Sequence, residues 1–122
     1  MILVDTSVWI DHFRAAEPQL VALLTSNDVL CHPLVIGEIA LGGVANRAQV
    51  LRLLANLPAA SAAAHDEAMA FIDTHKLANS GLGLIDTHLL AAAALTPGAL
   101  LWSRDKALRA AAARLNLDAG LR

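Results

Sequence analysis

The chain has 122 residues, which is about the length of one domain, so we expect a single domain over residues 1–122. Hydrophobic residues make up 57% of the chain and charged residues 16%, a composition that fills a core and excludes a disordered chain. The formal net charge of −2 gives no overall basic surface, and this counts against nucleic-acid binding, although several Arg and Lys residues concentrate in the last segment.

Strand and helix patterns alternate along the chain. Short apolar runs predict buried strands, and longer stretches with apolar residues on one face predict helices. In chain order we expect a strand at 1–4, helices at 8–14 and 19–25, a strand at 29–32, helices at 34–41 and 47–57, a weak strand at 58–64, helices at 65–77 and 84–95, a strand at 99–103, a helix at 106–115 and an edge strand at 117–121. This alternation indicates an α/β fold, in which helices cover both faces of a parallel sheet.

No segment of the sequence predicts export or a membrane crossing. Asp5 interrupts the apolar run at the N-terminus, which leaves no signal-peptide core, and residues 96–98 break the longest apolar region. Cys31 is the single cysteine, so an internal disulfide cannot form. We therefore expect a cytoplasmic protein without membrane contact.

Four acidic residues are predicted to converge on one crevice. Asp5 directly follows the first strand, and Asp105 stands just beyond the strand at 99–103. The carboxyl ends of parallel strands meet where the strand order switches, so both side chains are expected there. Glu38 lies on an apolar stripe of its helix without a cation nearby, and Asp86 occupies the first turn of a helix whose next turn is apolar. We expect both to face inward.

A pocket of four carboxylates favours a bound cation, because closely spaced negative charges cannot all stay ionised without one. The cluster offers oxygen ligands and no nearby cysteine or histidine, which suits Mg²⁺ or Mn²⁺. Such an ion can convert water to hydroxide and stabilise the charge that develops on a phosphate group. The pattern therefore indicates hydrolysis of phosphodiester bonds.

Each of the four acids could also have a purely structural role, and the chain could have a function other than that of a nuclease. Asp5, Asp86 and Asp105 could cap helices or lie against a helix dipole, and Glu38 could be a partly exposed residue of a surface helix. A phosphatase or a phospho-acceptor domain could use Asp5 as the group that takes the phosphate. The first needs a second aspartate where Ser7 stands, and the second needs paired acids and a late lysine that are not found. A non-catalytic binding domain is the third alternative, and the presence of all four acids speaks against it.

Four segments resemble, in order and spacing, the motifs of VapC-type PIN domains. They are residues 2–10 (ILVDTSVWI), Glu38 in its helix, residues 84–92 (LIDTHLLAA) and residues 101–106 (LWSRDK). The likeness covers essentially the whole chain and implies a parallel sheet of about five strands between helices. It also implies an endoribonuclease whose catalytic and metal-binding acids are Asp5, Glu38, Asp86 and Asp105, the last being the least constant.

The resemblance further implies supporting residues and partners. Ser7 and Ser103 are expected to support the acids through hydrogen bonds. As a toxin of a type II toxin–antitoxin system, the protein would cleave RNA with Mg²⁺ or Mn²⁺, form a homodimer and bind a VapB-like antitoxin that blocks the site. Apart from the resemblance, Arg104, Lys106 and Arg109 could hold phosphates of the substrate or lie on a solvated helix face.

Overall fold

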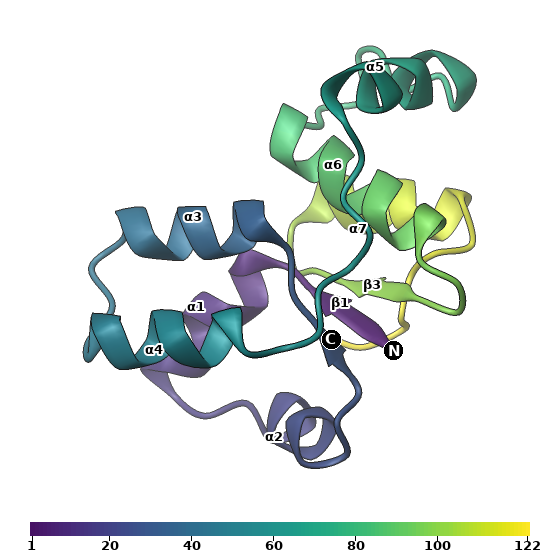
Figure 1. Cartoon of the computed structure of the whole chain (residues 1–122). Coiled ribbons are helices and arrows are strands. Elements are labelled where there is room, and N and C mark those ends of the chain that lie inside the picture. The colour runs from purple at the N-terminus through teal and green to yellow at the C-terminus, as the bar shows by residue number, and fades with distance from the viewer.

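The computed structural model describes all 122 residues and contains three strands and seven helices (Figure 1). The strands are β1 (Ile2–Val4), β2 (Val29–Leu30) and β3 (Leu100–Trp102). The helices are α1 (Thr6–Arg14), α2 (Pro18–Thr25), α3 (Pro33–Leu41), α4 (Arg47–Ala55), α5 (His65–Thr74), α6 (Leu84–Leu95) and α7 (Lys106–Arg114). None of the helices combines the length and the apolar character that crossing a membrane requires.

The three strands form one parallel sheet in the order β2-β1-β3, with β1 at its centre. Ile2 is paired with Val29 on one side and with Leu100 on the other. Leu3 and Val4 are fully buried, and burial on both faces explains why the sequence of β1 is apolar throughout. The predicted parallel α/β arrangement is therefore confirmed.

The expected number of about five strands is wrong, because two of the predicted strands are reduced to single bridges. Ala59 pairs only with Cys31, and Asp118 pairs only with one residue of β3, both in parallel. The segment around Ala59 is rich in alanine, which has little preference for strands. Beside Asp118, the positive φ angles of Asn116 (60°) and Gly120 (74°) end the extended backbone. Five chain segments thus lie side by side, but only three of them are strands.

Helix starts are set by residues that suit the first turn. α1 begins at Thr6 rather than at the predicted residue 8, because Asp5 caps it by accepting a bond from the Ser7 backbone N–H. Pro18 and Pro33 occupy the first positions of α2 and α3, where a backbone N–H is not needed and the fixed φ angle already suits a helix. These helices therefore begin one or two residues earlier than predicted.

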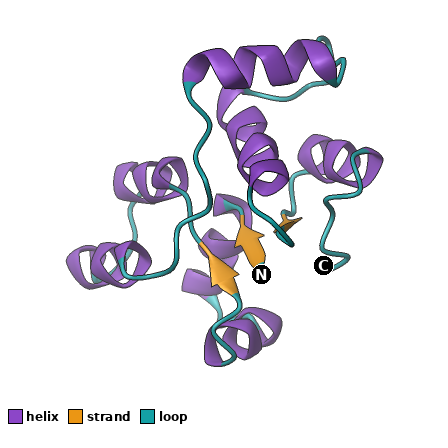
Figure 2. Cartoon of the chain, turned by 45° about the vertical axis from the view of Figure 1, so that its right-hand side comes forward, coloured by secondary structure: helices purple, strands orange, loops and turns teal.

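Helices surround the small sheet (Figure 2). On one side of the molecule α3 packs against α1 and α4, and on the other side α6 packs against α5 and β3 (Figure 1). The buried part of α6 is rich in alanine, since Ala91, Ala92 and Ala93 are each no more than 2% exposed. These small side chains let the helix lie close to the sheet, next to the fully buried Trp102.

The strand order reverses at β1, and this reversal positions the candidate site. α1 and α2 connect β1 to β2, whereas the helices α3 to α6 carry the chain from β2 to β3 on the opposite side of β1. The carboxyl ends of β1 and β3 therefore lie side by side, with Val4 paired to Trp102. Ligand sites of open α/β sheets form at such a reversal. Asp5 and Ser103 are the first residues beyond these two strand ends.

Candidate active site

Asp5 is held in one orientation by two serine hydroxyls. The residue is only 5% exposed. Ser7 Oγ donates to Asp5 Oδ2 at 2.7 Å, and Ser103 Oγ donates to the same oxygen at 2.8 Å. Every hydrogen bond that the Asp5 carboxylate accepts ends on Oδ2. The other oxygen, Oδ1, is therefore available to a ligand.

The same two hydroxyls also fasten the loop that follows β3. The backbone N–H of Arg104 donates to Ser7 Oγ at 3.0 Å, and the backbone N–H of Asp105 donates to Ser103 Oγ at 3.0 Å. Each hydroxyl thus accepts from a backbone N–H and gives its own proton to Asp5. Hydrogen bonds arranged in such chains polarise and strengthen one another. The end of β1 and the loop after β3 are consequently held as one unit.

Glu38 reaches the same region from α3. Thr6 Oγ1 donates to Glu38 Oε1 at 2.7 Å, and Thr6 itself is 8% exposed. Thr6 immediately follows Asp5, so this bond brings the Glu38 carboxylate to the start of α1. Nothing in the sequence marks Thr6 as a partner of Glu38. Its only signal there is its position next to Asp5, which is equally typical of a residue in the first turn of a helix.

Asp86 lies in the first turn of α6 and is half-buried. Its Oδ2 accepts a 3.1 Å hydrogen bond from the Gly83 backbone N–H. Burial raises the pKa of the Asp86 carboxyl, the bond from Gly83 opposes this, and the charges of Asp105, Asp5 and Glu38 raise the pKa further. The other three acids therefore lie close enough to Asp86 to disfavour its charged form.

Asp105 is exposed and caps α7, since its Oδ2 accepts from the Leu108 backbone N–H at 2.9 Å. All three aspartates thus stand at helix N-termini, since Asp5 caps α1 and Asp86 occupies the first turn of α6. These are the positions that the alternative role of helix capping predicts for them. The partial positive charge of a helix N-terminus stabilises a carboxylate there. Capping and metal binding are compatible when the carboxylate keeps a free oxygen or can rotate.

Asp86 is influenced by the charges of the other three acids, but the four do not form a metal-binding site as they stand. No three side chains of the types Asp, Glu, His and Cys lie close enough together to hold a metal ion as they stand. The reason is local, because each carboxylate is bonded to a different donor on its own element or its neighbour. No basic side chain forms an ion pair with any of the four acids. No charged side chain therefore compensates their negative charge.

Comparison with known proteins identifies the fold. The sequence model of the family described as PIN domain matches residues 2–114. The chain belongs to the PIN-domain family. It is also similar to the protein named Ribonuclease VapC32 in two strains of Mycobacterium tuberculosis, CDC 1551 / Oshkosh and ATCC 25618 / H37Rv. With each, the identity is 52% over 113 residues, which cover 93% of this chain and 91% of the relative. The predicted resemblance to VapC-type PIN domains is therefore confirmed.

The three basic residues Arg104, Lys106 and Arg109 differ in whether they form ion pairs. The guanidinium of Arg104 forms the only two ion pairs in the molecule, with Asp11 and Glu17. Lys106 is exposed and Arg109 is half-buried at the start of α7, and neither forms an ion pair. Of these three residues, only Arg104 is therefore engaged by acidic side chains.

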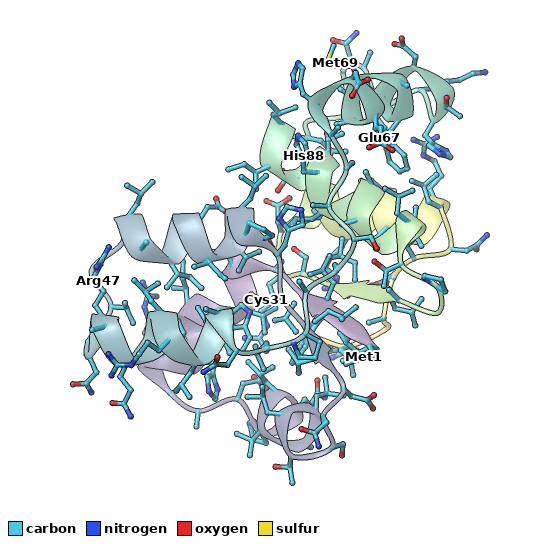
Figure 3. The ribbon with its side chains drawn as sticks, viewed as in Figure 1. Met1, Cys31, Arg47, Glu67, Met69 and His88 are labelled. Atoms are coloured by element: carbon cyan, nitrogen blue, oxygen red, sulfur yellow. The ribbon has the colours of Figure 1, made fainter.

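His88 lies on α6, two residues after Asp86 (Figure 3). Its ring centroid is 6.5 Å from that of His32, whose Nδ1 accepts from the Leu34 backbone N–H and so caps α3. Burial and, to a smaller extent, the charge of His88 lower the pKa of His32. With Nδ1 used as an acceptor, the proton of the neutral ring is on the buried Nε2, which has no partner. His32 therefore supports the helix that carries Glu38 and adds no positive charge to the acids.

Proposed function

We propose that this chain is a VapC-type toxin that hydrolyses RNA as an endoribonuclease, with a divalent metal ion bound by Asp5, Glu38, Asp86 and Asp105. The observation that carries this proposal is the uncompensated negative charge at the sheet edge. Burial and three neighbouring carboxylates raise the pKa of Asp86, and no basic side chain pairs with any of the four. A cation relieves such repulsion. The name of the relatives, Ribonuclease VapC32, supports the same activity.

The donor set fits Mg²⁺ or Mn²⁺, since hard cations prefer carboxylate oxygens. Each of the three aspartates accepts its hydrogen bonds on Oδ2, which leaves Oδ1 to a ligand. Rotation of the side chains would bring these oxygens towards one ion, since the acids do not form a metal-binding group as they stand. When bound, the ion would supply hydroxide at neutral pH and stabilise the negative charge of the phosphate under attack.

The residues of the chain itself orient the acids and the substrate. Ser7 and Ser103 keep Asp5 Oδ2 engaged, so that Oδ1 alone is presented to a ligand. Lys106 and Arg109 lie three positions apart on α7, and side chains at this spacing share one face of a helix. We assign to these two the contacts with RNA phosphates, which position a nucleic acid without reading its sequence.

An enzyme that cuts cellular RNA has to be restrained, and we assign this role to a VapB-like antitoxin in the cytoplasm. A groove of about 430 Å³ lies beside Glu38, and apolar side chains of α1, α3 and the following loop line it, among them Ile10, Phe13, Ile39 and Val44. Apolar residues of the antitoxin would fill the groove. An arginine would reach Glu38, because a guanidinium forms paired hydrogen bonds with a carboxylate.

A homodimer is the second proposed assembly. Met69 on α5 (Figure 3) and Leu95 on α6 are each 48% exposed, and Leu84 at the start of α6 is 51% exposed. Apolar side chains that are exposed together on a surface are typical of an interaction surface, and these three come from the packed pair α5 and α6. Light scattering on a size-exclusion column should give the mass of a dimer for the wild type and of a monomer for Met69→Glu. A monomeric wild type would contradict the homodimer.

The activity is tested by incubating the purified protein with total RNA in the presence of Mg²⁺, Mn²⁺ or a chelator. We expect cleavage with either ion and none with the chelator. The Asp86→Asn variant should be inactive, whereas Asp73→Asn, which removes a charge from an exposed position on α5, should cleave like the wild type. Cleavage by Asp86→Asn at the wild-type rate would remove Asp86 from the site.

The alternative phosphatase and phospho-acceptor functions predict different products. Both would act through Asp5, the first on small phosphate esters and the second by keeping a phosphoryl group on the carboxylate. Hydrolysis of p-nitrophenyl phosphate, or a phosphorylated Asp5 found by mass spectrometry, together with intact RNA, would favour these alternatives over the nuclease.

A further inference from the structure

Arg104 binds three other parts of the chain through its guanidinium. Nη1 donates to Asp11 Oδ2 at 2.8 Å, and Nη2 donates to Glu17 Oε2 at 2.6 Å. Nη2 also donates to the Arg122 carbonyl oxygen at 2.8 Å. The side chain therefore connects α1, the residue that caps α2 and the last residue of the chain. We call the contacts of Arg104 with Asp11, Glu17 and Arg122 the Arg104 clamp.

The side chain of Arg104 has little freedom to leave this position. Its guanidinium carbon lies 5.7 Å from the ring centroid of Trp102, within the range of a cation–π contact. Trp102 is fully buried, so the ring is a fixed platform. The hydrogen bonds that the guanidinium donates to Glu17 and Asp11 raise the pKa of Arg104 above its usual value, so the group stays charged. A guanidinium reaches two carboxylates and a carbonyl from two nitrogens in a fixed planar fork, whereas an ammonium would have to meet all three acceptors from one nitrogen.

The backbone of the same residue belongs to the candidate active site. Arg104 N donates to Ser7 Oγ at 3.0 Å. The residue before it, Ser103, donates to Asp5, and the residue after it, Asp105, caps α7. A shift of the Arg104 backbone would therefore disturb both serine hydroxyls and one of the acids together.

We propose that Arg104 is a positioning residue, whose clamp holds the loop at 103–105 so that Asp5 and Asp105 are oriented for metal binding; this inference rests on the proposed metal-dependent function. Without the clamp the loop moves, Ser103 loses its fixed distance to Asp5, and the carboxylate can turn. Metal affinity and the rate of the chemical step then fall, although Arg104 touches neither metal nor RNA.

The charges around Arg104 argue against a direct contact with phosphate. One guanidinium faces two carboxylates, both within 3 Å of it, so the group of Arg104, Asp11 and Glu17 carries a net negative charge. Such a group repels a phosphate. A residue that binds RNA and a residue that positions the acids also differ in kinetics, because loss of the first raises KM and loss of the second lowers kcat.

The experiment compares Arg104→Ala, Arg104→Lys and Glu17→Gln with the wild type. Arg114→Ala is the matched control, because Arg114 also donates to a backbone carbonyl, that of His75 at 2.7 Å, and lies at the other end of α7. Mn²⁺ affinity is measured without RNA by titration calorimetry, kcat and KM by RNA cleavage, and exchange of the Arg104 and Asp105 amide protons by NMR.

Positioning predicts a specific set of changes. Arg104→Ala should weaken Mn²⁺ binding and lower kcat by about 10- to 100-fold each, as is common when a residue that supports metal ligands is lost. KM should change little, and the Asp105 amide should exchange faster. Arg104→Lys and Glu17→Gln should show smaller changes of the same kind, because each keeps part of the clamp. Arg114→Ala should leave Mn²⁺ affinity, kcat and Asp105 exchange unchanged.

Two outcomes would overturn the inference. A raised KM with unchanged kcat and Mn²⁺ affinity would make Arg104 a phosphate-binding residue. Unchanged amide exchange of Asp105 in Arg104→Ala would show that the clamp does not hold the loop. Amide exchange needs neither metal nor RNA, so it tests the clamp even if the wild-type protein binds no metal ion and cuts no RNA, a result that would refute the proposed function alone.

Discussion

Ser103 and Asp5 lie 98 positions apart in the chain, and the hydroxyl of Ser103 donates a 2.8 Å hydrogen bond to Asp5 Oδ2. This bond joins the carboxyl ends of β3 and β1 where the strand order reverses. Ser103 also accepts from the Asp105 backbone N–H at 3.0 Å. One buried hydroxyl thus connects two of the proposed metal-binding acids, and its loss should affect stability and activity together.

Replacing Ser103 with alanine tests this connection. The change leaves the partly buried Asp105 N–H without its acceptor and the buried Asp5 carboxylate with one donor fewer, so the free energy of unfolding should fall by about 1–3 kcal/mol. RNA cleavage should fall as well, because Asp5 is less well oriented. Urea unfolding and a cleavage assay measure the two effects. Ser61→Ala, at an exposed position, should change neither; equal behaviour of the two variants would contradict the assigned role.

Removing the charge of Asp86 should not destabilise the metal-free fold. Asn keeps an oxygen that can accept from the Gly83 N–H, and it ends the repulsion by Asp105, Asp5 and Glu38. In a chelator at pH 7 we expect Asp86→Asn to equal the wild type or exceed it by up to about 1 kcal/mol, since charges at half-exposed sites are screened by water. Added Mg²⁺ should raise the melting temperature of the wild type more than that of the variant. Clear destabilisation in chelator would instead indicate a buried cationic partner.

The difference in stability between Asp86→Asn and the metal-free wild type should depend on pH, because the pKa of Asp86 is raised. A carboxyl whose pKa is higher in the folded than in the unfolded state lowers stability above both values. As the pH falls, the folded protein takes up the proton first, so this penalty shrinks below the folded-state pKa and is gone below the unfolded-state pKa. The stability advantage of Asp86→Asn in chelator should therefore shrink from pH 7 towards acid pH. Melts over a pH series measure it, and an advantage that grows on acidification would contradict the sign.

The bond from Thr6 to Glu38 can be removed almost without a change of shape. Thr6→Val deletes the only hydrogen-bond donor that the Glu38 carboxylate has within the chain. We expect a loss of about 1 kcal/mol of stability, typical of a hydrogen bond whose charged partner is still open to water, and a clear fall in Mn²⁺ affinity. Thr25→Val is the control, since Thr25 Oγ1 bonds only a carbonyl of its own helix. If Mn²⁺ binds both variants as tightly as the wild type, Glu38 is not a ligand that Thr6 orients.

Much of the architecture could be predicted because it depends on local patterns. The apolar run before Asp5 and the one before Ser103 predicted the two strands whose ends meet at the site. The strand predicted around Ala59 was not formed beyond one bridge, because alanine-rich sequence and pairing on one side alone do not sustain a strand. A strand at a sheet edge depends on its neighbour more than on its own sequence.

The candidate site was predictable as a set of residues but not as a set of contacts. The acids could be found from strand ends and an apolar helix stripe. Their hydrogen-bond donors could not, because a bond such as that from Thr6 to Glu38 joins residues 32 positions apart. Arg104 was interpreted as a possible phosphate contact for the same reason, since its partners Asp11 and Glu17 lie 93 and 87 positions away. Long-range polar contacts leave no periodic trace in a sequence.

The chemistry of the cleaved RNA ends tests the proposed metal-dependent hydrolysis most directly. Purified protein is incubated with RNA and Mg²⁺, and the new ends are identified by their ability to be ligated and by mass spectrometry. Attack by a metal-activated water on phosphorus predicts a 5′-phosphate and a 3′-hydroxyl, formed by the wild type and not by Asp86→Asn. A 2′,3′-cyclic phosphate would contradict it, because that product arises from attack by the ribose hydroxyl and not by water.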